Sequence, residues 1–305
     1  MPLAGGARPV RPREHVTLHG LDGEVLARSA RGDGRHLVLK VAIAGTPAVL
    51  KLYGRKRDWL RDALRGLGQR WFVGKTGMSP TARCTTERET LALWRRHGFD
   101  VPAALDLPLP AAVPPQRLLL EWLEGELLHR PIARRDVPLA EKVALLERLA
   151  ADWGRRHVVA LREREPRLIQ AHAMLSHVFR VPATGAATNL STNAATALRL
   201  VTFDFEVAWA RRSALPRLIS LEIAQLLESV AAWGPLEQLP ALIAAFVNAY
   251  PDRAVIERLA VDVRRGPLPP FAWIHGIALQ LRERGPRRKR SVLRHVETAL
   301  KERLE

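Results

Sequence analysis

Two segments decide the fold of this chain: RLIQAHAMLSHVFRV at residues 167–181 and LRLVTFDFEVAW at residues 198–209. Residues 178–181 of the first and 198–205 of the second are mostly apolar or β-branched, which is typical of β-strands. If the two strands pair as a hairpin, the residues before the first strand lie close to those after the second. Two imidazoles and two carboxylates are then expected to lie close together at this end of the hairpin. They are His172, His177, Asp204 and Glu206.

The spacing of these residues resembles the two catalytic segments of protein kinases. In a kinase, a catalytic Asp and an Asn five residues later precede one strand, and the metal-binding Asp of a D-F-G motif follows the next strand. Here His172 stands in the catalytic Asp position, His177 in the Asn position and Asp204 in the D-F-G position. Gln170 stands where the kinase loop has its His. The chain departs from the kinase pattern most clearly at His172.

At a finer level, the pattern resembles the lipopolysaccharide core kinase family of the Kdo kinase/WaaP type, especially its InaA-like branch. The motifs His177-Val178-Phe179 and Asp204-Phe205-Glu206 carry this resemblance, which covers roughly residues 20–230. It implies an α+β, protein kinase-like fold of two lobes, one small and antiparallel β, the other larger and mainly helical. It also implies ATP as the phosphoryl donor, Mg²⁺ or Mn²⁺ as the metal, His177 and Asp204 as metal ligands, and His172 and Asp204 as catalytic residues.

The length and composition of the chain allow one large domain or two moderate ones. It has 305 residues, of which 47% are hydrophobic, so a sizeable core is available. We expect residues 1–15 to form a flexible N-terminal segment and residues 16–123 to form a kinase-like N-lobe with a basic insertion at 54–84. Residues 124–305 are expected to form a helical C-lobe that carries the catalytic and metal loops.

Three strand-like runs open the expected N-lobe. They lie at residues 23–30, 35–44 and 47–53, with a glycine-containing turn between the first two. By the kinase resemblance, Gly32 and Gly34 lie in the turn that covers the nucleotide phosphates, and Lys51 of the third strand pairs with those phosphates. Without the other motifs, an edge-strand lysine that faces water is the better interpretation of Lys51.

A helix is expected next, at residues 85–97, with Thr85 or Thr86 as its N-cap. In a kinase, a Glu of this helix pairs with the strand lysine. We select Glu89 for that role, with Glu87 as the second choice. Either residue could instead be a surface acid placed favourably near a helix N-terminus.

The connection between the lobes and the helices after it are read from apolar runs. Residues 117–122 form a strand that resembles the kinase hinge, where backbone groups of Glu121 and Leu123 would bind adenine; a plain core strand is the alternative. Residues 138–162 keep one apolar face and form a long helix before the catalytic loop. Further helices are expected at residues 219–230, 240–250, 251–263, 271–284 and 291–304.

The chain is strongly basic, with 48 Lys and Arg against 31 Asp and Glu and a net charge of +17. Such a charge favours anionic partners without choosing among them. Within the insertion 54–84, apolar residues recur at helical spacing amid many arginines, which predicts an amphipathic helix. Its basic face is either solvated or a contact for an anionic lipid-linked saccharide or the inner membrane surface. Nucleic acid ranks low as a partner, because no known reader module is present.

The single cysteine, Cys84, excludes a disulfide within the chain and a thiolate zinc cluster, which suits a reducing compartment. The N-terminal residues lack the apolar core of a signal peptide, and no apolar run reaches the ~20 residues of a membrane span. We therefore expect a cytoplasmic protein, either free or peripheral at the inner face of a membrane.

Two functional hypotheses follow from these residues. The first is an ATP-dependent phosphotransferase that resembles the core sugar kinases and acts on a hydroxyl of a saccharide or lipid-linked sugar. In it, His172 accepts the hydroxyl proton, since imidazole titrates near neutral pH. The second is a pseudokinase or binding module of the same fold, because His172 replaces the catalytic Asp. A purely structural role for His172 and His177 also stays open.

Overall fold

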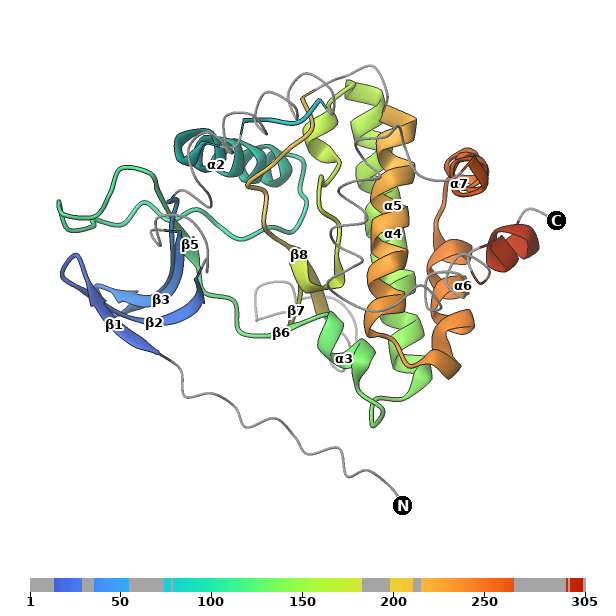
Figure 1. Ribbon diagram of the computed structural model, residues 1–305, viewed down its shortest axis with the longest axis horizontal. Helices are drawn as coiled ribbons and strands as arrows, with labels where there is room; N and C mark the ends of the chain where they lie inside the picture. The colour runs from blue at the N-terminus through green and yellow to red at the C-terminus, as the bar shows by residue number, and fades with distance from the viewer. Residues whose placement is uncertain are drawn as a thin grey trace, which may run out of the picture.

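The computed structural model describes residues 14–28, 36–54, 74–77, 79–182, 198–210, 215–265, 295 and 297–303. Figure 1 shows a β-sheet part and a helical part side by side, with helix α2 above the sheet and the short β6–β8 sheet between the two parts. This arrangement confirms the predicted two-lobe α+β fold.

The N-terminal sheet has five strands in the order β1-β2-β3-β4-β5, and each adjacent pair is antiparallel. The strands are β1 His15–Leu18, β2 Leu21–Arg28, β3 Leu37–Ile43, β4 Thr46–Leu52 and β5 Arg117–Glu121. The runs predicted at 23–30, 35–44 and 47–53 correspond to β2, β3 and β4, whereas β1 was not predicted. The turn that contains Gly32 and Gly34 lies outside the described residues.

The β3–β4 turn shows how the local sequence sets the register of this sheet. Ile43 pairs with Thr46, so only Ala44 and Gly45 form the turn, and both have positive φ angles, 49° and 79°. Two central residues with positive φ match the twist of antiparallel strands. The turn therefore fixes the register that places Lys51 opposite Val38 on β3. On its other side, Lys51 pairs with Leu118 of β5.

Helix α2, Pro80–Arg96, starts earlier than the predicted helix 85–97. The Ser79 side chain accepts a hydrogen bond from the Ala82 N–H at 3.2 Å, and Pro80 occupies the first turn. A proline is tolerated there because its missing N–H would have no partner within the helix. The prediction that Thr85 or Thr86 caps the helix is therefore wrong, and the last residues of the predicted basic insertion belong to α2.

The second sheet confirms the predicted hairpin. Strands β6 Glu126–Leu127, β7 Val178–Pro182 and β8 Leu198–Thr202 form an antiparallel sheet in that order. Val178 pairs with Thr202, so the residues before β7 and those after β8 leave the sheet at the same end. Strand β8 ends at Thr202, three residues before the predicted end, and frees Phe203 and Asp204 for the site.

Helices form the rest of the C-terminal part. They are α3 His129–Ala133, α4 Leu139–Glu163, α5 Leu215–Trp233, α6 Leu239–Ala249 and α7 Arg253–Arg265, with short 3₁₀ helices η2 Pro166–Leu168, η3 Leu175–His177 and η4 Leu236–Gln238. The predicted helices at 138–162, 219–230, 240–250 and 251–263 correspond to α4, α5, α6 and α7. The predicted helix at 271–284 lies outside the described residues. Of the last one, residues 295 and 297–303 are described and helical.

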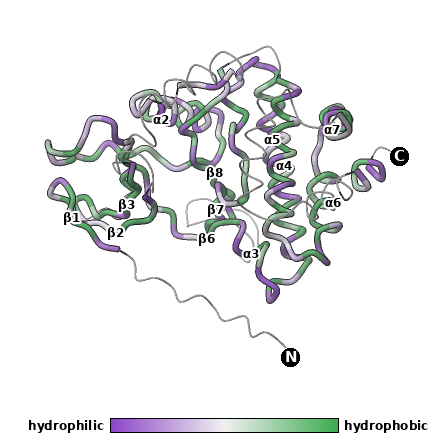
Figure 2. Tube along the Cα trace, viewed as in Figure 1, coloured by the Kyte–Doolittle hydropathy of each residue, from purple (hydrophilic) through white to green (hydrophobic). Residues whose placement is uncertain are grey.

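The helical core is centred on α4, whose apolar face includes Leu146, Leu149 and Trp153. Figure 2 shows hydrophobic stretches along α4 and α5 interrupted by hydrophilic positions, as expected for amphipathic helices. At Gly154 of α4, an added Cβ would lie 2.2 Å from Cγ of Pro251, so only glycine permits this approach. Among the helices built from described residues, none combines the length and apolarity needed to cross a membrane.

Candidate functional site

A buried ion pair joins the N-terminal sheet to helix α2. The Lys51 Nζ on β4 lies 2.8 Å and 2.7 Å from the two carboxylate oxygens of Glu87 on α2. The Tyr53 hydroxyl donates to Glu87 Oε2 at 2.5 Å. Burial works to lower the pKa of Lys51, but the carboxylates around it outweigh burial and raise that pKa above its ordinary value. Lys51 is therefore a fixed positive charge at neutral pH.

The prediction that Glu89 pairs with Lys51 is wrong, and the second choice, Glu87, is the partner. Glu89 is exposed and lies 3.5 Å from Arg167 Nη1. The reason is helical geometry: two residues apart on an α-helix means about 200° of rotation, so Glu87 and Glu89 face opposite ways. The start of α2 at Ser79 and its packing on the sheet turn Glu87 inward, where its side chain is 1% exposed.

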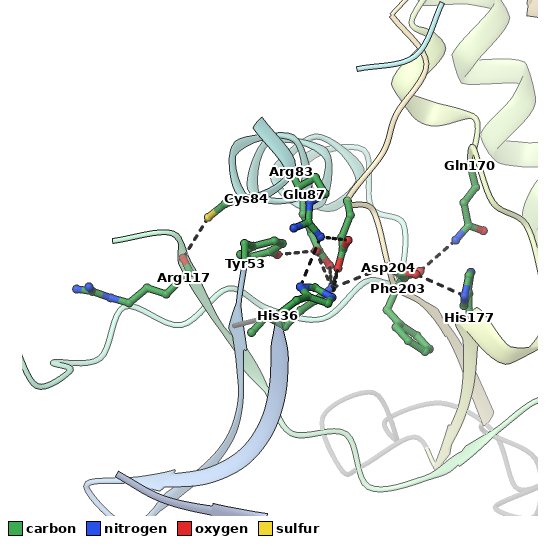
Figure 3. Close-up of polar contacts among 12 residues, drawn as sticks. His36, Tyr53, Arg83, Cys84, Glu87, Arg117, Gln170, His177, Phe203 and Asp204 are labelled. Atoms are coloured by element: carbon green, nitrogen blue, oxygen red, sulfur yellow. Dashed lines mark hydrogen bonds and ion pairs between the residues drawn. The ribbon is translucent and has the colours of Figure 1, made fainter. Parts of the chain in front are cut away.

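A second buried carboxylate, Glu206, lies beside this pair. Its oxygens lie 2.9 Å from Arg83 Nη1, 3.3 Å from His36 Nε2 and 3.6 Å from Lys51 Nζ. Arg83 also donates to the Gly54 carbonyl. Figure 3 shows Arg83, His36 and Tyr53 gathered around Glu87. Neither Arg83 nor His36 was predicted from the sequence. The one available signal was the position of Arg83 four residues before Glu87, on the same helix face.

The structure brings His177 and Asp204 together, as predicted. The His177 Nδ1 lies 2.8 Å from the carbonyl oxygen of His172. A carbonyl can only accept, so Nδ1 carries the hydrogen and, in the neutral ring, Nε2 presents a lone pair. That Nε2 lies 3.4 Å from Oδ2 of Asp204. One imidazole nitrogen and one carboxylate oxygen therefore face each other, an arrangement that a cation between them would satisfy.

Asp204 belongs to a wider group of carboxylates. Asp204, Glu87 and Glu206 each place an oxygen within 4.8 Å of the others. Asp204 Oδ1 also lies 3.6 Å from Lys51 Nζ, so Asp204 is reached by the lysine on one side and by His177 on the other. Its backbone φ is +69°, a left-handed conformation that side chains other than glycine rarely adopt. The contacts with Lys51 and His177 hold Asp204 in this strained conformation.

The loop that contains His172 is anchored from both sides. The Gln170 Nε2 donates to the Phe203 carbonyl at 3.0 Å, which ties the loop to the residue before Asp204. The Gln170 N–H donates to Glu222 Oε1 at 2.9 Å. Phe203 N–H in turn donates to the His177 carbonyl at 3.0 Å. Gln170 thus has a structural role in the loop, while His172 supplies the backbone carbonyl that orients His177.

Glu222 anchors the loop from within the helical core. It accepts from Arg156 Nη2 at 2.8 Å and from His157 Nε2 at 2.7 Å. Burial alone would raise the pKa of Glu222, but Arg156 and His157 outweigh it and lower that pKa. Burial and the Arg156 charge lower the pKa of His157, whose Nδ1 accepts from the Tyr250 hydroxyl at 2.6 Å. This buried hydrogen-bond network fixes the carboxylate that binds the loop at the Gln170 N–H.

The residues expected at the hinge lie at the end of β5 and directly after it. The Glu121 N–H already donates to the Ala103 carbonyl at 2.9 Å, and Glu121 Oε1 accepts from the Ala103 N–H at 2.9 Å. Leu123 follows β5 and is half-buried. The chain then passes Gly125, where an added Cβ would lie 2.3 Å from the Arg180 carbonyl oxygen. Adenine binding by Glu121 and Leu123 stays a prediction, and so does phosphate binding by Gly32 and Gly34, which lie outside the described residues.

Together, the fold and the site define a protein kinase-like arrangement. A strand lysine, Lys51, pairs with a helix glutamate, Glu87, and Asp204, which follows the β7–β8 hairpin, lies next to that lysine. No protein-family model and no curated protein sequence matches the chain. Solved structures that resemble it include WaaP in complex with acyl carrier protein, at 14% identity, 94% of this chain, 91% of that chain and a TM-score of 0.43.

Two other solved structures show a weaker likeness. The Rio2 kinase from Chaetomium thermophilum matches at 15% identity over 79% of this chain and 73% of that chain, with a TM-score of 0.38. An aminoglycoside phosphotransferase from Alicyclobacillus acidocaldarius matches at 15% identity over 92% of this chain and 90% of that chain, with a TM-score of 0.33. Because the identities are this low, the roles of individual residues are argued from the contacts within this chain.

Proposed function

We propose that this protein is an ATP-dependent phosphotransferase that transfers a phosphoryl group to a hydroxyl of a saccharide or lipid-linked sugar. The observation that carries the proposal is the position of Asp204 between two partners of different kinds. Lys51, fixed by Glu87, lies 3.6 Å from Asp204 on one side, and the oriented His177 lies 3.4 Å from it on the other. Phosphoryl transfer needs such a set: a cation for the phosphates and a metal site next to it.

Each residue has a definite part in this proposal. Lys51 binds the nucleotide phosphates, and Glu87 keeps its ammonium in place. Asp204 and His177 are the ligands of Mg²⁺ or Mn²⁺, which neutralises phosphate charge when bound. The imidazole nitrogen favours Mn²⁺, since Mg²⁺ prefers oxygen ligands. His172 orients the acceptor hydroxyl and accepts its proton near neutral pH.

The nature of the acceptor is the less direct part of the proposal. It is supported by the resemblance to the lipopolysaccharide core kinases and by the net charge of +17, which favours an anionic partner. The insertion at residues 54–84 supplies basic residues for contact with an anionic lipid-linked saccharide or the inner membrane surface. On this proposal, the reaction takes place at the cytoplasmic side of that membrane.

A pseudokinase with the same fold is the second candidate. Two observations favour it: His172 stands where kinases carry the catalytic Asp, and Glu206 stands in the last D-F-G position. Glu206 is buried and bound by Arg83, and it adds a third carboxylate around Lys51. A lysine surrounded in this way has less positive charge to offer to phosphates. Such a protein would bind nucleotide weakly and transfer no phosphate.

Thermal unfolding with ATP or ADP, alone and with Mg²⁺ or Mn²⁺, tests the site first. A ligand that binds only the folded protein raises the melting temperature. We expect a metal-dependent rise in the wild type that D204A abolishes. The matched control is D100A, which removes an exposed carboxylate that pairs with Arg199 and lies outside the cluster of Asp204, Glu87 and Glu206. Equal rises in D204A and the wild type would contradict the proposed metal site.

Transfer of labelled γ-phosphate to saccharide and lipid-linked sugar acceptors then separates the two candidates. An active phosphotransferase labels an acceptor, and both D204A and H172A lose that label. Nucleotide binding that depends on Asp204 with no labelled acceptor would favour the pseudokinase. Full transfer by D204A would refute the phosphotransferase mechanism as stated.

A further inference from the structure

One lysine outside the proposed machinery contacts the loop that contains His172. Lys75 belongs to the short segment 74–77, which lies shortly before α2 in the sequence. Three hydrogen bonds fix this segment against residues 208–210: Ala210 N–H to the Gly74 carbonyl at 2.7 Å, Thr76 N–H to the Ala208 carbonyl at 2.9 Å, and Ala208 N–H to Thr76 Oγ1 at 3.1 Å. Lys75 itself forms a β-bridge with Trp209.

The side chain of Lys75 reaches across this bridge to the catalytic loop. Its Nζ donates to the carbonyl oxygen of Ala171 at 3.1 Å and lies 4.5 Å from the ring centroid of Trp209. Ala171 is bonded directly to His172. A second bridge, between Gln170 and Ala208, places the loop beside the same segment. Lys75 therefore ties the end of the basic insertion to the backbone of the proposed catalytic residue.

Lys75 keeps its position at a cost in stability. The residue is 8% exposed, and burial lowers its pKa from 10.5 to about 8. Within the described part of the chain, its ammonium has the Ala171 carbonyl as hydrogen-bond acceptor and no carboxylate partner. A buried cation without a counter-charge destabilises the folded state. A lysine kept under these conditions is better explained by a functional role than by a contribution to folding.

The composition of the loop indicates what that role is. Residues 169–177, IQAHAMLSH, contain no lysine or arginine. The loop therefore has no permanent cation of its own to fix its backbone or to offset charge that develops during phosphoryl transfer. Lys75 supplies one from another part of the chain, through a charge-assisted hydrogen bond that is stronger than one between neutral groups.

We propose that Lys75 is a positioning residue for the catalytic loop, whose ammonium holds the Ala171 carbonyl and thereby the backbone of His172. The structural part of this inference is independent of the reaction, while its effect on turnover rests on the proposed phosphotransferase function. The insertion then has a direct connection to the site through Lys75. Loss of the Lys75 ammonium should therefore lower kcat and leave the KM for ATP unchanged, because a different residue, Lys51, binds the nucleotide.

The protonation state of Lys75 gives the contact a pH dependence. The titratable groups on the elements packed against it are His172 and His177 in the loop and Asp204 and Glu206 before Trp209. The last three have the partners described above. Below pH 8 the ammonium is charged and the contact is strong. Above pH 8 the amine is neutral, and its hydrogen bond to the Ala171 carbonyl is weaker.

Hydrogen–deuterium exchange on the full chain tests the structural part. We expect K75M to lower the protection factors of the amides at residues 171–177 at pH 7, and K75R, which keeps the charge, to preserve more of that protection. The control is K40M, which removes another lysine that lies over a tryptophan, Trp122, at 3.9 Å. It should leave the loop amides unchanged. Equal loop protection in K75M and the wild type would overturn the proposal.

The stability cost provides a second readout. Because the pKa of Lys75 is lower in the folded protein, the unfolded chain binds more protons between pH 8 and 10.5, and wild-type stability should rise with pH across that window. K75M should therefore be at least as stable as the wild type at pH 7, with a difference that shrinks as the pH approaches 10.5. A K75M protein that fails to fold at pH 7 would refute the claimed cost and with it the proposal.

Kinetics test the functional part once an acceptor is found. The wild-type kcat should fall as the pH rises through about 8, and K75R should move this alkaline limb to higher pH. If no acceptor is ever phosphorylated but K75M still loosens the loop, the proposed function fails while the positioning role stands. If transfer is measured and K75M has the wild-type kcat and loop protection, the positioning role fails and the function stands.

Discussion

His177 Nε2 and Asp204 Oδ2 face each other at 3.4 Å, and the His172 carbonyl sets the orientation of the imidazole by accepting from Nδ1. In the neutral ring, Nε2 and the carboxylate oxygen both present lone pairs, so the contact is favourable only with a proton or a metal ion between them. A nitrogen donor that is already oriented in this way also has consequences for which metal the site prefers.

The first prediction concerns that preference. Replacing the imidazole nitrogen by an amide oxygen in H177N should shift the ratio of Mn²⁺ to Mg²⁺ affinity toward Mg²⁺ by about tenfold. Electron paramagnetic resonance of bound Mn²⁺ should show nitrogen hyperfine coupling in the wild type and lose it in H177N. H97N is the control, since His97 pairs with Glu163 at the end of α2. Nitrogen coupling that persists in H177N would remove His177 from the metal site.

The second prediction compares two glutamates on the same helix. E87Q removes the carboxylate that lies nearest to buried Lys51 and should cost about 3 kcal/mol of unfolding free energy. E89Q changes an exposed residue two positions away and should stay within about 0.5 kcal/mol of the wild type. Urea titrations of both variants measure the difference. Equal losses would mean that the Lys51–Glu87 pair is not a buried ion pair in solution.

The third prediction concerns acid sensitivity. Burial and Arg156 lower the pKa of His157 in the folded protein below its ordinary 6.5, so the unfolded chain takes up a proton first as the pH falls. The stability that this residue contributes is present above pH 6.5 and is lost below it, with a slope of up to about 1.4 kcal/mol per pH unit. In H157N, the unfolding free energy should vary less with pH between 6.5 and 5. A wild type and H157N with parallel pH curves would contradict the proposed neutral His157.

The fourth prediction concerns the packing of α4. In a helix with open space, replacing glycine by alanine stabilises by about 1 kcal/mol. At Gly154 the added Cβ would lie 2.2 Å and 2.4 Å from Cγ and Cδ of Pro251, so G154A should instead destabilise by about 2 kcal/mol. Adding P251A removes those two atoms and should recover part of the loss in a double-mutant cycle. Simple additivity of the two single variants would argue against this contact.

Local patterns in the sequence were enough to predict the hairpin and the long helix. The apolar runs of β7 and β8 and the apolar face of α4 have regular spacing, and the hairpin then brings His177 to Asp204 without further information. The start of α2 was missed because Thr85 and Thr86 look like caps, whereas Ser79 followed by Pro80 forms the actual one. The choice of Glu89 over Glu87 was wrong for a different reason: the packing of α2 on the sheet decides which face of the helix points inward.

The rest of the site depends on contacts that are distant in the sequence. Arg83 and Glu206 are 123 residues apart, and Lys75 and Ala171 are 96 apart. No periodicity within a single segment contains such pairings, because they arise only when the sheets and α2 pack together. Lys75 is buried and has no carboxylate partner among the residues that the structure describes. Sequence patterns favour an exposed lysine, so its position becomes apparent only from the packed structure.

The two ends of residues 55–73 are fixed at different parts of the site. On one side, the Gly54 carbonyl accepts from Arg83, which also binds Glu206; on the other, the Gly74 carbonyl accepts from the Ala210 N–H. The Gly54 contact reaches Glu206 through Arg83, whereas the Gly74 contact reaches residue 210 through its backbone, so the two attachments share no residue. Loss of either contact would therefore leave the other intact.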